Sequence, residues 1–127
     1  MGEYLHEAFD RLSVELEAPT TPNELFVRYA IAAHTLYNFA KERNLTQPRL
    51  PWNDLSMCVT LIKQIRNLFA HSIIEPKWNI TERYRLLYEF DDISISLIDK
   101  HGLDFDFGQV GGPETIFALR KALEDRI

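Results

Sequence analysis

Apolar residues recur every three or four positions through the first part of the chain, which is the spacing of one face of a helix. This pattern predicts an amphipathic helix over residues 3–17. Its apolar face would consist of Leu5, Phe9, Leu12 and Leu16. A second helix is expected from Pro22 to about Arg43, because proline suits the first helical position. Thr21 and Glu24 form a capping box around that start. Apolar residues lie on most sides of this helix, which is typical of the centre of a bundle.

A loop is expected over residues 44–52, which contain two prolines. A third helix is predicted from Asn53 or Asp54 to about His71. One broad face of it is apolar and the opposite face is polar, with Arg66 on the border. The apolar face would contain Leu55, Met57, Cys58, Leu61, Ile62, Ile65, Leu68 and Phe69.

A fourth helix is predicted over about 80–100, where Asn79 and Glu82 provide a start signal and Gly102 an end. The segment 93–97 alternates between apolar and polar residues, however, and this alternation is also typical of a strand. The helix is preferred for this segment because of its start and end signals.

Residues 103–111 are expected to be irregular, and a fifth helix is predicted to open at Gly112-Pro113-Glu114. Its inner face would contain Ile116, Leu119 and Leu123. The chain shows no internal repeat. The expected fold is therefore all-α: an up-and-down bundle of four main helices plus a short C-terminal fifth helix.

The composition fits one helical domain over residues 1–127, because 46% of the residues are apolar and 12% are aromatic. No apolar run is long enough to cross a membrane, and the first residues do not resemble a signal peptide. The single cysteine, Cys58, excludes an intramolecular disulfide and would be an inert core residue. A cytoplasmic location is the simplest expectation.

The charge of the chain is unevenly distributed. The net charge is −5, yet residues 41–85 contain eight basic and four acidic side chains, a local balance of +4. The basic residues are Lys41, Arg43, Arg49, Lys63, Arg66, Lys77, Arg83 and Arg85. This central segment is the only plausible place for a polyanion to bind. An ordinary solvated surface would give the same pattern.

The segment Ile65-Arg66-Asn67-Leu68-Phe69-Ala70-His71-Ser72 contains the best candidates for chemistry. Arginine can hold a phosphate with two parallel hydrogen bonds, and histidine exchanges protons near neutral pH. Arg66, Asn67 and His71 are therefore predicted as a catalytic group, with Lys63 as a further substrate-binding residue. A structural role would fit as well, with Arg66 pairing locally and His71 stabilising the end of the helix.

The spacing of arginine and histidine is weak evidence alone, because Arg28 and His34 also satisfy it. These two residues would point about 120° apart around the second helix. His34 is interpreted as a packed or capped histidine of a buried helix.

The segment 65–71 closely resembles the signature of the HEPN superfamily (higher eukaryotes and prokaryotes nucleotide-binding domains). Members of that superfamily have an arginine and, four to six residues later, a histidine at a helix end in an all-α bundle. The segment is also similar to the Ile-Arg-Asn-x-Phe-Ala-His stretch of mannitol-operon repressor-type proteins. The two resemblances imply different functions.

The HEPN resemblance implies a metal-independent endoribonuclease of the toxin or defence type, with no cofactor. His71 would act as general acid or base, Arg66 would stabilise the pentavalent phosphorane, and Asn67 would position a phosphate or the histidine. The resemblance also implies a site shared across a two-fold homodimer and a cognate antitoxin. A dimer suits the spacing, because Arg66 and His71 lie about 140° apart around a single helix.

The alternative is a noncatalytic regulatory or protein-interaction domain, as the repressor-like resemblance allows. One HEPN toxin subgroup has a tyrosine two residues after the histidine, whereas this chain has Ile73. Its four histidines and one cysteine show no zinc spacing, so no metal site is expected. Asp106-Phe107-Gly108 spells part of a kinase signature but stands alone, and is interpreted as coincidence.

Overall fold

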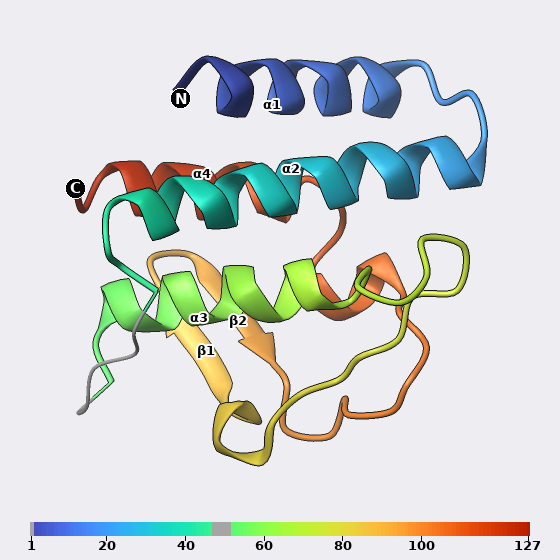
Figure 1. Ribbon diagram of the computed structural model, residues 1–127. Helices are drawn as coiled ribbons and strands as arrows, with labels where there is room; N and C mark the ends of the chain where they lie inside the picture. Colours follow the sequence, from blue (N-terminus) through green and yellow to red (C-terminus); the bar gives the residue numbers. More distant parts are fainter. Residues whose placement is uncertain (1, 47–51) are drawn as a thin grey trace.

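The computed structural model describes residues 2–46 and 52–127, which form four α-helices and one β-hairpin (Figure 1). The helices are α1 (Gly2–Glu17), α2 (Pro22–Glu42), α3 (Asp54–Asn67) and α4 (Thr115–Glu124). The strands are β1 (Leu87–Phe90) and β2 (Ile93–Ser96), and two short 3-10 helices, η1 and η2, span Glu82–Tyr84 and Phe107–Val110. No helix of the described residues is long and apolar enough to cross a membrane.

The first two helices are antiparallel neighbours, and α2 packs between α1 and α3 (Figure 1). The predicted bounds of both helices match the structure to within a residue. The side-chain oxygen of Thr21 accepts a hydrogen bond from the Glu24 backbone N–H at 3.0 Å, which caps α2 at its predicted start. In the connection between α1 and α2, the Glu15 carboxylate accepts hydrogen bonds from the Thr20 backbone N–H and hydroxyl at 2.7 and 2.8 Å.

The prediction of an all-α bundle with a fourth helix over 80–100 is wrong. That segment forms η1 and an antiparallel hairpin in which Tyr88 pairs with Ile95 and Phe90 with Ile93. Ile93, Ile95 and Leu97 of the alternating pattern are buried, and Ser94 between them faces outward, as in a sheet with one covered face. Asp91 makes the tight turn at a φ of 52°, a conformation that aspartate tolerates better than most residues. The hairpin packs against α3 and α4.

The C-terminal helix therefore ranks fourth and not fifth, and it begins at Thr115. Ile116, Leu119 and Leu123 are buried, as expected for its inner face. The segment before it is only partly irregular, because residues 107–110 form η2. Asp106 caps η2 by accepting a hydrogen bond from the Gly108 backbone at 3.0 Å, so the kinase-like tripeptide has a local structural role. Most of the predicted loop over 44–52 lies outside the described residues.

The third helix starts as predicted but ends early. Asn53 and Ser56 form a reciprocal capping box at its start. The helix ends at Asn67, and the next three backbone N–H groups donate to carbonyls three residues earlier instead of four. These donors belong to Leu68, Phe69 and Ala70. The chain then leaves the helix axis before it reaches His71.

Candidate functional site

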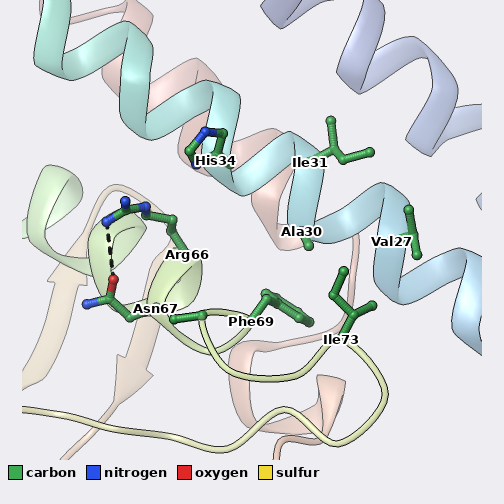
Figure 2. Close-up of a pocket in the computed structure, with 9 residues that line it drawn as sticks. Val27, Ala30, Ile31, His34, Arg66, Asn67, Phe69 and Ile73 are labelled. Carbon is green, nitrogen blue, oxygen red and sulfur yellow. Dashed lines mark hydrogen bonds between the residues drawn. The ribbon is translucent and has the colours of Figure 1, made fainter.

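A cavity of about 530 Å³ lies between α2 and the segment that follows α3 (Figure 2). Its volume falls within the range of small-molecule sites, and its lining is mainly apolar with a few polar groups at one end. The polar lining residues are His34, Arg66 and Asn67, and the apolar ones are Val27, Ala30, Ile31, Phe69, Ala70 and Ile73. None of these nine residues is acidic, and Arg66 provides a permanent positive charge.

The last turn of α3 places Arg66 and Asn67 at this cavity. Ile65 and Leu68, on either side of them, are only 1% and 2% exposed, so they fix the turn to the core. The two polar residues between them are half-buried and face the cavity. The sequence therefore positions this pair by placing apolar anchors immediately before and after it.

The guanidinium of Arg66 is held by two contacts. Its Nη1 donates a hydrogen bond to Asn67 Oδ1 at 3.3 Å (Figure 2). Its Cζ lies 4.7 Å from the centre of the Tyr37 ring. No carboxylate makes an ion pair with Arg66 among the described residues. Its remaining donors are thus available to an anion in the cavity.

Phe69 fixes the segment after α3 against the core. Its ring centre lies 5.9 Å from that of Tyr29, 5.9 Å from that of Phe105 and 6.3 Å from that of Phe26. Aromatic pairs at such distances stabilise a core beyond simple burial. Burial in this cluster also raises the pKa of the Tyr29 hydroxyl, which therefore stays protonated. Phe69 thus packs into this aromatic cluster just after α3 ends at Asn67.

His71 does not line the cavity. It lies beyond the end of α3, is exposed, and follows the turn that Phe69 anchors. The predicted angle between Arg66 and His71 assumed one continuous helix, and that assumption is wrong. Within one chain the structure brings Arg66 together with Asn67 but not with His71.

His34, which is predicted to be a packed or capped histidine of a buried helix, is exposed and lines the cavity. Its Nε2 lies 3.1 Å from Asn38 Nδ2, one turn further along α2. Arg28 and His34 do not share a site. Arg28 forms an ion pair with Glu24 at 2.8 Å and does not line the cavity.

A signal for His34 was present in the sequence. Val27, Ala30, Ile31 and His34 stand at positions i, i+3, i+4 and i+7, which is one continuous helix face. Apolar residues on most sides of α2 nevertheless predict that this face is covered as well. In the structure this face borders the cavity (Figure 2).

Lys63 is not part of the cavity lining, and its ammonium lies 5.8 Å from the centre of the Tyr84 ring. Other basic residues of the central segment also make local contacts. Arg43 Cζ lies 3.6 Å from the Phe39 ring centre, Arg85 donates to the Ile80 carbonyl, and Lys77 pairs with Asp104. Arg49 lies outside the described residues. Of the described basic residues in that segment, Arg66 alone lines the cavity.

The described residues contain no group of three or more histidine, cysteine or carboxylate side chains that could hold a metal ion. Cys58 is fully buried, and burial raises the pKa of its thiol to about 12. Comparisons with protein-family models, curated proteins and solved structures found no match. The functional assignment therefore rests on the chemistry of the cavity and on the short sequence resemblance.

Proposed function

We propose that this protein is a HEPN-like RNA-binding protein that holds a phosphate of RNA at Arg66 and Asn67. The observation that supports this most is the position of Arg66, a half-buried arginine without a carboxylate partner among the described residues, at a cavity whose lining contains no acid. The side chain of Asn67 lies beside it and offers an amide N–H₂ as a further donor.

The apolar part of the cavity suits the base of a nucleotide. Phe69, Ile31 and Val27 provide an apolar wall against which an unpaired base can pack. Single-stranded RNA presents such bases next to its phosphates. An RNA loop or end fits this cavity better than a duplex, whose bases are stacked and paired.

We further propose that the bound RNA is cleaved without a metal ion, as the HEPN resemblance implies. The ribose 2′-hydroxyl would attack the adjacent phosphorus, leaving a 2′,3′-cyclic phosphate, and Arg66 would stabilise the charge that develops on the phosphoryl oxygens. A histidine would exchange the protons. We also propose that the protein forms a homodimer, as the resemblance implies.

Binding and cleavage of a short single-stranded RNA by the purified protein, in the presence of a chelator, test this proposal. Arg66→Ala should weaken binding at least about tenfold, because a hydrogen bond to a charged group contributes roughly 1.5–3 kcal/mol. Cleavage should fall with it, and the products should end in a cyclic phosphate.

Arg83→Ala is the matched control. This substitution removes the same charge as Arg66→Ala. The Cζ of Arg83 lies 4.7 Å from the centre of the Tyr84 ring, the same distance as that of Arg66 from the Tyr37 ring, but Arg83 does not line the cavity. It should bind RNA like the wild type. Equal loss in both variants would indicate a diffuse electrostatic effect and would contradict a phosphate site at Arg66.

A noncatalytic protein-interaction module is the second candidate, and the cavity rim favours it. Ile31 and Ile73 are 44% and 39% exposed, and the neighbouring Ile74 is 68% exposed. Exposed apolar residues of this kind are common at protein interfaces. A protein that binds no RNA but loses self-association in Ile73→Asp, measured by light scattering, would support this second candidate and contradict the first.

A further inference from the structure

We infer that His34, and not His71, is the acid–base residue that acts on the phosphate held by Arg66, and that Asn38 positions it. This inference rests on the proposed function. It assigns a residue that the sequence resemblance does not indicate.

The first support is location. His34 and Arg66 line the same cavity, from α2 and α3 respectively, and Arg66 extends from α3 toward α2 (Figure 2). A histidine can exchange a proton with the substrate only if it is within hydrogen-bond reach of the reacting oxygen. Within one chain His34 meets the necessary condition of lining the site, whereas His71 lies outside the cavity.

The second support is the contact with Asn38. The Asn38 amide lies 3.1 Å from Nε2, and when it is rotated so that its oxygen faces the ring it accepts a hydrogen bond from Nε2–H, which leaves Nδ1 of the neutral ring with a free lone pair. When Nδ1 takes up the substrate proton, the hydrogen bond from Nε2–H to the amide oxygen persists. Asn38 can therefore hold the ring in both protonation states, which is what an acid–base residue needs.

The charged groups around His34 are few. Arg66 is the charged residue that faces the cavity from α3. From α1, Glu7 and Arg11 border a separate pocket on the other side of Ile31, and they pair with each other at 2.8 Å. No carboxylate is among the hydrogen-bond or ion-pair partners of His34 in the described part of the chain. The ring is thus free to act on a bound ligand.

His34 acts first as a base and is restored by the end of the reaction. His34 takes the proton of the ribose 2′-hydroxyl, the 2′-oxygen bonds to phosphorus, and the bond from phosphorus to the 5′-oxygen breaks. A water molecule protonates the leaving 5′-oxygen, and the resulting hydroxide takes the proton from His34. The products are a 2′,3′-cyclic phosphate and a 5′-hydroxyl, with the imidazole regenerated.

Single-turnover cleavage and binding of a short single-stranded RNA by His34→Gln and His71→Ala test the assignment. Glutamine keeps a polar side chain at position 34 but cannot act as the base. His34→Gln should lower the cleavage rate at least about 100-fold, the usual contribution of acid–base catalysis, while RNA binding stays within about threefold. His71→Ala should cleave like the wild type. His34→Ala should regain cleavage when imidazole is added.

Asn38→Ala tests the positioning role. It should lower kcat and alter the acidic limb of the pH–rate profile, while KM for RNA and the thermal unfolding midpoint stay unchanged. A fall in the unfolding midpoint with an unaltered pH profile would show a structural role instead.

The remaining outcomes distinguish a failure of the His34 assignment from a failure of the proposed function. Cleavage that survives His34→Gln but is lost in His71→Ala would overturn the assignment of His34 and leave the proposed function intact. Binding without cleavage by the wild type would overturn the acid–base role. A wild-type protein that neither binds nor cleaves RNA would overturn the proposed function, and the assignment of His34 with it.

Discussion

Arg66 illustrates how single residues set the chemistry of this cavity. A solvated arginine on a helix surface is unremarkable, but here the guanidinium is half-buried between Asn67 and the Tyr37 ring. These contacts limit the rotamers of a long side chain before any ligand arrives. A phosphate would therefore bind with a smaller loss of side-chain entropy than it would at a mobile arginine.

Cys58 should be unreactive in the folded protein. Its thiolate is the reactive form, and burial raises the pKa of the thiol to about 12, so it stays protonated at neutral pH. A disulfide reagent such as DTNB should label it slowly in the native protein and rapidly after denaturation. Fast labelling of the native protein would show that the α3–α4 contact opens readily.

At the scale of elements, the end of α3 decides which residues share the site. Helical periodicity in the sequence extends past Asn67, so the predicted helix carried His71 with it. Aromatic packing of Phe69 outweighs that local preference and ends the helix one turn earlier. Because Phe69 pairs with residues distant in sequence, such as Phe105, a local pattern could not reveal this.

Phe69→Ala should both destabilise the fold and weaken RNA binding. Truncating a buried phenylalanine costs roughly 3–5 kcal/mol, and because Phe69 is half-buried we expect about 2 kcal/mol in the free energy of unfolding. Phe117 is a matched control, since it is also half-buried and packs on Phe9 at 5.3 Å, away from the cavity. Phe117→Ala should show comparable destabilisation in urea with normal RNA binding. Equal binding loss in both variants would argue against a local role for Phe69.

The turn between α1 and α2 should contribute stability that depends on pH. Two hydrogen bonds from Thr20 lower the pKa of the Glu15 carboxyl in the folded state, and the one from its backbone N–H has a larger effect than the one from its hydroxyl. A lowered folded-state pKa means that the contribution is present above the unfolded-state value, about 4.3. It is lost as the pH falls through the folded-state value.

Thermal unfolding of the wild type and Glu15→Gln at pH 7 and pH 3 measures this contribution. The wild type should be more stable at pH 7, and the difference should shrink at pH 3. A constant difference at both pH values would show that the charge of Glu15 is not what stabilises the turn.

At the scale of the whole molecule, the hairpin and α4 complete a core that α1, α2 and α3 alone do not close. Fully buried aromatic residues such as Trp78 and Tyr88 come from the segment that connects α3 to α4. The alternating pattern of this segment is visible in the sequence. It forms strands and not a helix because the two strands pair with each other and pack against α3. The first helix follows from its apolar periodicity, and the starts of α2 and α3 follow from local capping signals, so the sequence alone could predict them.

Arg126 connects the C-terminus to two other elements. Its guanidinium pairs with both oxygens of Asp91 in the hairpin turn, at 3.0 and 2.7 Å, and with Asp54 at the start of α3, at 3.3 Å. Arg126→Ala should lower the urea midpoint clearly more than Lys121→Ala, which removes only an exposed pair with Asp125. Equal midpoints in the two variants would show that this three-part network contributes little.

The central proposal is that RNA binds in the cavity between α2 and the end of α3. The most direct test is an NMR titration of isotope-labelled protein with a short single-stranded RNA, followed at the backbone amides and the histidine rings. Binding at the cavity predicts shifts at residues 27–34 and 66–73, including the His34 ring, and none at Glu15 or Thr20. No shifts, or shifts confined to surfaces outside these two segments, would contradict it.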